Sequence, residues 1–290
     1  MVQRILWVMI LWVGLSSWVL ADGFREQFRA AFKAGDLPAA EKVLTDWEKA
    51  NPKDPDLYVA RFNFLLNKAT RRTAGVAGVP ATATTPAQRP QPPRVSYDPA
   101  IMTQATAALQ QGIALAPERL DMRLGLAKGY ELMGQPEPLL RTLRETLDAR
   151  KAGKPWTWRD GEALPAPEEA FVPAAIESFA SAYWKQPGDR GLEHGRPIAE
   201  LMQKYFPQNS LGYFNLGVYY AHLNKMPEAY EKMQQADALQ PNDMSTLMNL
   251  TDLAIKLKHK DEASKYLERV RKMPNGAAAA DSFASAMQKL

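Results

Sequence analysis

Histidine is the side chain that most often carries acid–base chemistry near neutral pH, and this chain of 290 residues has three of them. His194, His222 and His259 do not have the spacing of metal ligands on one helix, and no carboxylate joins them in a recognisable catalytic motif. We therefore predict that each histidine is a surface or groove residue rather than a ligand.

Chemistry based on cysteine is excluded because the chain has none, which rules out disulfides, thiolate nucleophiles and zinc–thiolate sites. The sequence also lacks the H-E-x-x-H and G-x-S-x-G motifs, a phosphate-binding glycine loop and a dinucleotide fingerprint. Adaptable core filler, rather than a copper site, is the expected role of Met202, Met233, Met244, Met248 and Met273. We predict that the protein is not an enzyme and uses no metal and no cofactor. An enzyme with an unrecognised site, built from carboxylates distant in sequence, is the less favoured alternative.

Composition and charge narrow the class of partner. Hydrophobic residues make up 46% of the chain and charged residues 23%, so most of it can bury a core. The formal net charge is +4, which is small for this length, and the positive charge is spread along the chain. We therefore expect no nucleic-acid partner.

The N-terminal residues 1–21 have the layout of a secretory signal peptide. Arg4 precedes an apolar run, Ile5–Leu20, and Val19 and Ala21 form a small-residue cleavage pattern. The run is short for a membrane span, which needs about 20 residues, although its tryptophans would also suit an uncleaved anchor. With no cysteine, an exported chain fits a bacterial envelope. We predict a periplasmic protein, with an inner-membrane anchor or full secretion as alternatives.

A period of 34 residues runs through the C-terminal half of the chain. The positions that repeat as apolar or small residues are Tyr213, Leu216, Gly217, Tyr220, Ala229, Met233 and, near its counterpart, Pro241. They match the pattern W-x2-L-G-x2-Y…A-x3-F…P, with tyrosine in place of tryptophan and methionine in place of phenylalanine. The chain therefore resembles the tetratricopeptide repeat (TPR) family, without pointing to one member of it.

The repeat pattern predicts pairs of antiparallel helices that stack on copies of themselves. Gly217, which has no side chain, is expected to let the partner helix approach closely. The predicted hairpins are 21–54, 55–119, 120–153, 176–209, 210–243 and 244–277, and residues 277–290 are expected to form a capping helix. The fold class is therefore all-α, a TPR-like right-handed superhelix (an α-solenoid) of about six hairpins.

Two segments interrupt the period and divide the array. Residues 70–98, within an N-terminal part over 22–153, are rich in proline, alanine and threonine, and we predict a disordered insertion there. Its arginines suggest, as the alternative, an arm for an acidic partner, a glycan or a membrane surface. Residues 154–175 form a linker to the C-terminal part over 176–290.

The linker carries two tryptophans outside any helical stripe, Trp156 and Trp158. One interpretation is that they anchor an interface, since tryptophan is enriched among residues that contribute most to binding. The other interpretation is that they fold back and fill the gap between the two parts of the array.

The resemblance implies that the first helix of each hairpin lines a concave groove, which takes an extended peptide or a partner's helix. The expected groove residues of the last two hairpins are Asn215, Val218, His222, Asn249, Asp252 and Lys256. Trp184, Phe214 and Met248 would make the groove partly apolar, which suits an occupant with apolar anchors.

Asn215 and Asn249 are one period apart, so we expect their side chains to project in line. Asparagine can bond both the N–H and the C=O of a peptide backbone, and some family members hold a C-terminal carboxylate with two such asparagines and nearby lysines. Here Leu211, Ala279 and Phe283 stand where basic residues would be needed, so carboxylate capture is not expected. The alternative is that asparagine before Leu-Gly is simply common in this repeat.

These observations predict a non-catalytic scaffold or adaptor in the bacterial periplasm or cell envelope, whose partner is another protein. Membrane contact is expected only through an uncleaved signal or the basic insertion over 70–98. The alternative function is an accessory protein that binds an envelope glycan or lipid through this insertion and the linker tryptophans.

Overall fold

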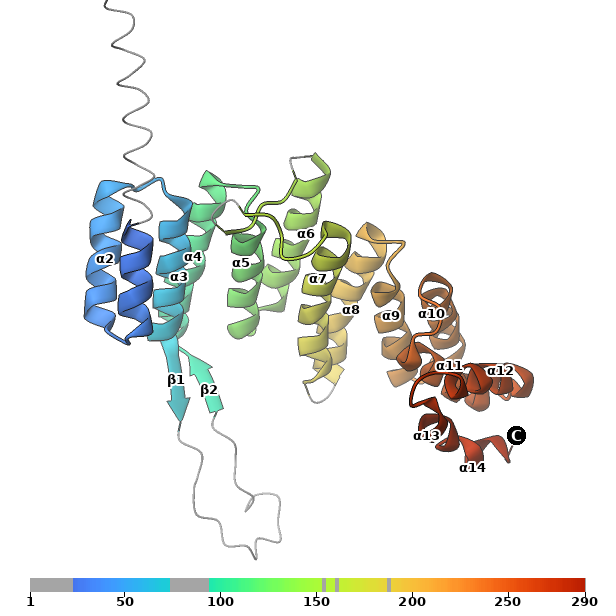
Figure 1. The fold of residues 1–290 in the computed structure, drawn as a ribbon. Coiled ribbons are helices and arrows are strands. Elements are labelled where there is room, and N and C mark those ends of the chain that lie inside the picture. The colour runs from blue at the N-terminus through green and yellow to red at the C-terminus, as the bar shows by residue number, and fades with distance from the viewer. Residues whose placement is uncertain (1–22, 74–93, 153–154, 160–161, 187–188, 290) are drawn as a thin grey trace, which may run out of the picture. The chain divides into compact units, whose positions relative to one another are not determined.

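The computed structural model describes residues 23–73, 94–152, 155–159, 162–186 and 189–289, and these are helical apart from one short ribbon and the connections (Figure 1). The fold is therefore all-α, as predicted. The predicted signal segment, residues 1–21, lies outside the described residues. Within the described part of the chain, no helix is both long enough and apolar enough to cross a membrane.

The chain divides into two compact units, Met1–Ala163 and Leu164–Leu290. Unit 1 contains a helix over residues 23–33, α2 (Leu37–Ala50), α3 (Pro55–Ala69), α4 (Pro99–Leu115), α5 (Leu120–Leu132) and α6 (Pro136–Ala152). Unit 2 contains α7 (Glu168–Trp184), α8 (Asp189–Tyr205), α9 (Ser210–His222), α10 (Met226–Leu239), α11 (Met244–Lys256), α12 (Lys260–Arg271), α13 (Gly276–Asp281) and α14 (Ala284–Met287). Within each unit, successive helices pack against each other.

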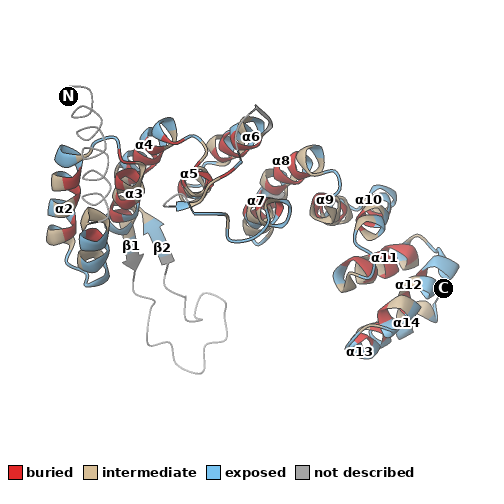
Figure 2. Cartoon of the chain, turned by 45° about the horizontal axis from the view of Figure 1, so that its top comes forward, coloured by how far each residue is buried: buried red, intermediate tan, exposed pale blue. Residues whose placement is uncertain are grey.

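Most helices are amphipathic, with buried residues on one side and exposed residues on the other (Figure 2). In unit 1, one cluster of buried side chains forms around Trp47 and Leu57, and a second forms around Leu109 and Met122. In unit 2, the described core runs through α10, α11 and α12 and includes Leu250. Each unit thus buries its own apolar core.

The helices of unit 2 repeat with the predicted period. α9 begins at Ser210 and α11 at Met244, and α10 begins at Met226 and α12 at Lys260. Both pairs of starting residues are offset by one 34-residue period, which is the length of a TPR hairpin. The hairpins predicted from the spacing are therefore the structural repeat.

Four hairpins turn in the same way between their two helices. The residue at the turn has a positive φ, near 60–75°, in Gly35, Gly134, Asn224 and Lys258. The next amide donates to the carbonyl five residues earlier, as in Lys225 to Tyr220 at 2.9 Å and His259 to Ala254 at 2.8 Å. This is the Schellman motif, which satisfies carbonyls that the end of a helix leaves unpaired.

Aspartate starts three helices of unit 1. The carboxylates of Asp36, Asp54 and Asp98 accept hydrogen bonds from amides in the first turns of α2, α3 and α4, and each of these turns contains a proline. The carboxylate accepts a hydrogen bond from a backbone N–H that has no partner within the helix, and proline has no backbone N–H that needs a partner. The sequence therefore fixes where these helices begin.

Gly217 allows α9 and α10 to approach closely, as predicted. A Cβ atom added to Gly217 would lie 2.9 Å from Cγ of Met233 on α10. Met233 itself is fully buried.

The insertion over 70–98, predicted to be disordered, has an ordered base. β1 (Thr70–Thr73) pairs with β2 (Arg94–Tyr97) in an antiparallel ribbon that joins the end of α3 to the start of α4. The reason is local: the amide of Asp98 bonds the carbonyl of Ala69 at 2.9 Å, so the two strands leave the helices side by side. Residues 74–93 lie outside the described residues.

Two boundaries differ from the prediction. α7 begins at Glu168, so part of the linker predicted over 154–175 is helical. The capping helix predicted over 277–290 consists of two short helices, α13 and α14. The break between them allows Phe283 and Met287 to pack against the core of unit 2.

Candidate functional site

The predicted groove residues Phe214 and Val218 lie on α9, and Met248 lies on α11. All three side chains are half-buried, and they pack against the core of unit 2 while part of each remains at the surface. We call this apolar area, together with the polar residues beside it on α9 and α11, the first-helix face. It gives unit 2 apolar side chains at the surface of two successive first helices.

Asn215 does not project from α9 as predicted. Only 6% of this residue is exposed, and its Nδ2 atom is buried without a hydrogen-bond partner in the described structure. The reason is that α9 packs against α7, α8 and α10, so more of its surface is covered than a pattern within one hairpin indicates. Asn215 and Asn249 are therefore not equivalent, and the expectation that they project in line is wrong.

The polar residues on α11 bond within their own helix. Nδ2 of Asn249 donates to the carbonyl of Ser245 at 2.8 Å, and Nζ of Lys256 pairs with Asp252 at 2.7 Å. His222 is exposed at the end of α9. Because Asp252 and Lys256 neutralise each other, this part of the first-helix face has almost no net charge.

Trp184 joins three helices of unit 2. It is the last residue of α7, its ring edge faces the ring of Tyr219 on α9 with centroids 6.4 Å apart, and Gly195 on α8 leaves room for it. A Cβ atom at Gly195 would lie 2.9 Å from the Trp184 ring. The indole Nε1 is buried and bonds no described residue. Trp184 is half-buried and is thus mainly a packing residue.

A polar cluster beside Trp184 was not predicted. The hydroxyl of Tyr219 donates to Glu193 at 3.0 Å, and Arg196 lies over the Tyr219 ring and pairs with Glu200 at 2.6 Å. Burial and the bond to Glu193 raise the pKa of Tyr219, so it stays neutral near physiological pH. The one signal in the sequence is the i, i+4 spacing of Arg196 and Glu200.

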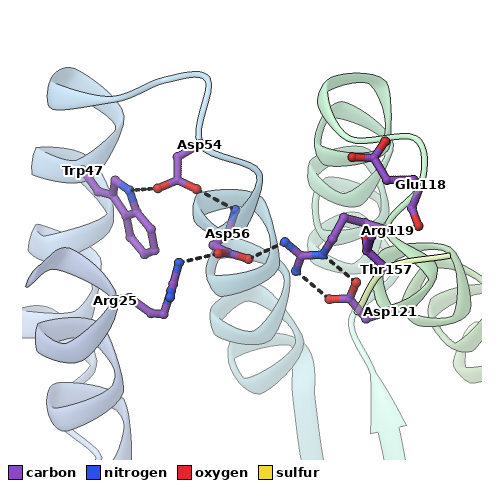
Figure 3. A network of polar contacts seen from close by, with 8 residues as sticks. All are labelled: Arg25, Trp47, Asp54, Asp56, Glu118, Arg119, Asp121 and Thr157. Atoms are coloured by element: carbon purple, nitrogen blue, oxygen red, sulfur yellow. Dashed lines mark hydrogen bonds and ion pairs between the residues drawn. The ribbon is translucent and has the colours of Figure 1, made fainter. Parts of the chain in front are cut away.

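Unit 1 contains a buried charge network that sequence spacing did not reveal (Figure 3). Arg119, which is 5% exposed, bonds both carboxylate oxygens of Asp121 at 2.7 and 2.8 Å and pairs with Asp56 at 2.8 Å. Asp56 also pairs with Arg25 on the helix over 23–33. Burial alone would lower the pKa of Arg119, but the two aspartates outweigh it and raise the pKa.

The linker tryptophans differ in exposure. Trp156 is 6% exposed and packs within unit 1, with the Arg123 guanidinium 5.4 Å from its ring, so it is not an exposed anchor. Trp158 is half-buried, and its amide donates to the carbonyl of Glu162 at 2.8 Å. Trp156 thus packs against its own unit, and the interpretation that the tryptophans fill the gap between the two parts of the array stays a prediction.

Unit 1 also has a crevice of about 410 Å³ on α2, α3 and α4. Its lining includes Leu44 and Phe64, which are each 4% exposed, so the floor offers little free apolar surface. Ion pairs join α2 to α3 beside it, between Glu48 and Arg61 and between Glu41 and Lys68. The crevice contains none of the predicted site residues, and we assign no function to it.

Among the described residues, no three histidine, aspartate or glutamate side chains come together as metal ligands. Two of the three histidines contact aromatic rings: His194 lies against Tyr183 with centroids 5.4 Å apart, and His259 against Tyr230 at 5.6 Å.

No protein-family model and no curated protein sequence matches the chain. Solved structures with a similar arrangement include YrrB, described as a TPR protein with an unusual peptide-binding site (11% identity, 83% of this chain and 97% of that one, TM-score 0.43). Others are MamA (14%, 64% and 92%, 0.39) and the TPR2AB domain of yeast Sti1 in complex with pHSP90 (14%, 93% and 99%, 0.36). These scores are low, and the fold assignment rests on the repeated hairpins and their turns.

Proposed function

We propose that this chain, a TPR-type protein by its repeated hairpins, is a non-catalytic scaffold that binds another protein through the first-helix face of unit 2. The observation that supports this most is the half-exposed apolar set of Phe214, Val218 and Met248 on α9 and α11. Partly exposed apolar side chains on successive helices suit a helix or an extended segment that inserts apolar anchors.

The charge of this face favours an apolar segment over an acidic one. α9 carries no aspartate, glutamate, lysine or arginine, and Lys256 on α11 is already paired with Asp252. A carboxylate would find no free lysine or arginine on these two helices. We therefore propose that the partner segment binds mainly by burying apolar side chains, with charge contributing little.

The asparagines have separate roles in this proposal. Asn249 lies at the surface, and its amide can exchange its bond to Ser245 for one to a partner backbone. The buried Nδ2 of Asn215 gains a bond only if the side chain rotates outward. Asn249 is thus the residue that would fix the orientation of a bound segment.

We propose the bacterial periplasm or cell envelope as the location, on the basis of the signal-like residues 1–21. The alternative of glycan or lipid binding has less support. Arg71, at the base of the insertion, is paired with Asp98 at 2.7 Å, and Trp156 is buried.

The test begins with photo-crosslinking in cells at Met248, which identifies the partner. The affinity of the purified chain for that purified partner is then measured. We expect Val218→Asp combined with Met248→Asp to weaken binding at least tenfold, because the anchors would meet charge. The control position is Lys265, which is exposed on α12 outside the first-helix face. Equal crosslinking at Met248 and Lys265, or unchanged affinity of the folded double variant, would contradict the proposal.

A further inference from the structure

The segment 155–159, which we call the strap, is held on unit 1 by a short backbone ladder. The amide of Thr157 donates to the carbonyl of Glu118, and the amide of Leu120 donates to the carbonyl of Thr157, both at 3.0 Å. Thr157 thereby forms a parallel bridge with Arg119 at the corner between α4 and α5. Both of these backbone hydrogen bonds are made by one residue of the strap, Thr157.

Burial of the Trp156 side chain, which directly precedes Thr157, costs free energy because its indole N–H has no hydrogen-bond partner in the described structure. Trp156 inserts beside Arg123, whose Nε donates to the carbonyl of Pro117 at 2.9 Å. The indole Nε1 of Trp156 is shielded from solvent and bonds no group in the described part of the chain. An unpaired buried donor opposes docking, because the donor would regain a bond to water on release.

The corner that receives the strap is itself held by the buried charge network. Thr157 bonds the backbone on either side of Arg119, while the Arg119 side chain reaches Asp121 on α5 and Asp56 on α3 (Figure 3). Arg119 therefore fixes the backbone that carries both partners of Thr157. Asp56 also pairs with Arg25, which connects the network to the helix over 23–33.

We propose that the strap is a releasable latch, which the Arg119 network holds in its docked position. When the latch is docked, Thr157 is held at the corner between α4 and α5, and α7 begins at Glu168. When it is released, the corner no longer holds Thr157, which lies between α6, ending at Ala152, and α7. The latch thus sets how far unit 2 can move from unit 1. The inference does not depend on the partner-binding surface.

Hydrogen exchange on the full mature chain tests whether the latch opens on its own. We expect the amides of Thr157 and Leu120 to exchange at least tenfold faster than buried amides in the middle of α5, because the strap opens without unfolding unit 1. Arg119→Lys should raise the rate at Thr157 further, because lysine lacks the planar fork with which Arg119 bonds both oxygens of Asp121 and also reaches Asp56. Arg269→Lys, which breaks a similar bidentate pair with Asp237 in unit 2, is the control and should leave the strap unchanged.

A measurement of the distance between α6 and α8 tests whether the latch limits the movement of unit 2 relative to unit 1. The chain has no cysteine, so cysteines introduced at exposed Arg144 on α6 and Lys204 on α8 would be the only sites that take a spin label. Thr157→Pro removes the strap amide and should broaden the distance distribution, whereas Thr157→Ala keeps the amide and should not. Strap amides that exchange as slowly as α5, or a distribution that Thr157→Pro leaves unchanged while α5 remains protected, would overturn the proposal.

Discussion

The missing side chain of Gly217 sets the distance between α9 and α10. We expect Gly217→Val to lower the free energy of unfolding by about 1–3 kcal/mol, because its side chain would displace the buried Met233. Urea denaturation followed by circular dichroism measures the change.

Gly125→Ala is the matched control, because it is also a helical glycine. Its Cβ would meet one methyl group of Leu109 at 3.2 Å, which can move slightly. This substitution should leave stability unchanged or raise it, since alanine favours a helix by about 1 kcal/mol over glycine. Equal effects of the two substitutions would show that close approach at Gly217 is not what limits its replacement.

Single positions also show where sequence reasoning about the site stops. Asn215 and Asn249 occupy the same place in the repeat, yet one is buried and the other bonds Ser245 at the surface. The spacing within a hairpin predicts which side of its own helix a residue lies on. It does not predict how much of that side the neighbouring helices cover, and α9 packs against α7 and α8 as well as α10.

The hairpin turns are repeated elements with different residues at the left-handed position. In the last hairpin that residue is Lys258, with φ of 62°. This conformation costs a residue with a Cβ about 1–2 kcal/mol, and glycine avoids the cost while losing some entropy on folding. We expect Lys258→Gly to stabilise the protein by about 0.5–1 kcal/mol, measured by urea denaturation.

Lys265→Gly is the control for this turn, because Lys265 lies inside α12. It should destabilise the protein by about 1 kcal/mol, since glycine is a poor helix former. If both substitutions destabilise, the left-handed turn at Lys258 carries no strain that glycine can relieve.

The hairpins could be predicted because local signals agree with the fold. Apolar spacing, the small residue at Gly217 and the proline stops all act within one repeat. The strap and the base of the insertion could not be predicted in this way. Burial of Trp156 depends on Arg123 and on the corner at Arg119, which lie more than thirty residues earlier in the chain (about one repeat).

The C-terminal end of unit 2 must be covered, because a stack of hairpins ends in an apolar surface. α13 and α14 cover it with Ala280, Phe283 and Met287. We expect a chain that ends at Asn275 to self-associate, with a concentration-dependent sedimentation coefficient. A chain that ends at Met287, which lacks only residues 288–290, should sediment like the full chain.

A monodisperse chain ending at Asn275, with its helical content otherwise retained, would contradict this prediction. It would mean that the surface left exposed on the last hairpin, α11 and α12, is not apolar enough to cause self-association.

The ribbon of β1 and β2 makes the helix packing of unit 1 independent of the residues inserted between the two strands. Thr73 and Arg94 face each other in the ladder, so the chain leaves and re-enters the hairpin at one fixed point. The bond from the amide of Asp98 to the carbonyl of Ala69 closes the base of the ribbon, so the contact between α3 and α4 does not depend on the residues inserted beyond it. The segment 74–93 can therefore diverge, lengthen or be exchanged for a foreign domain during evolution or engineering, with the stack acting as an unchanging frame.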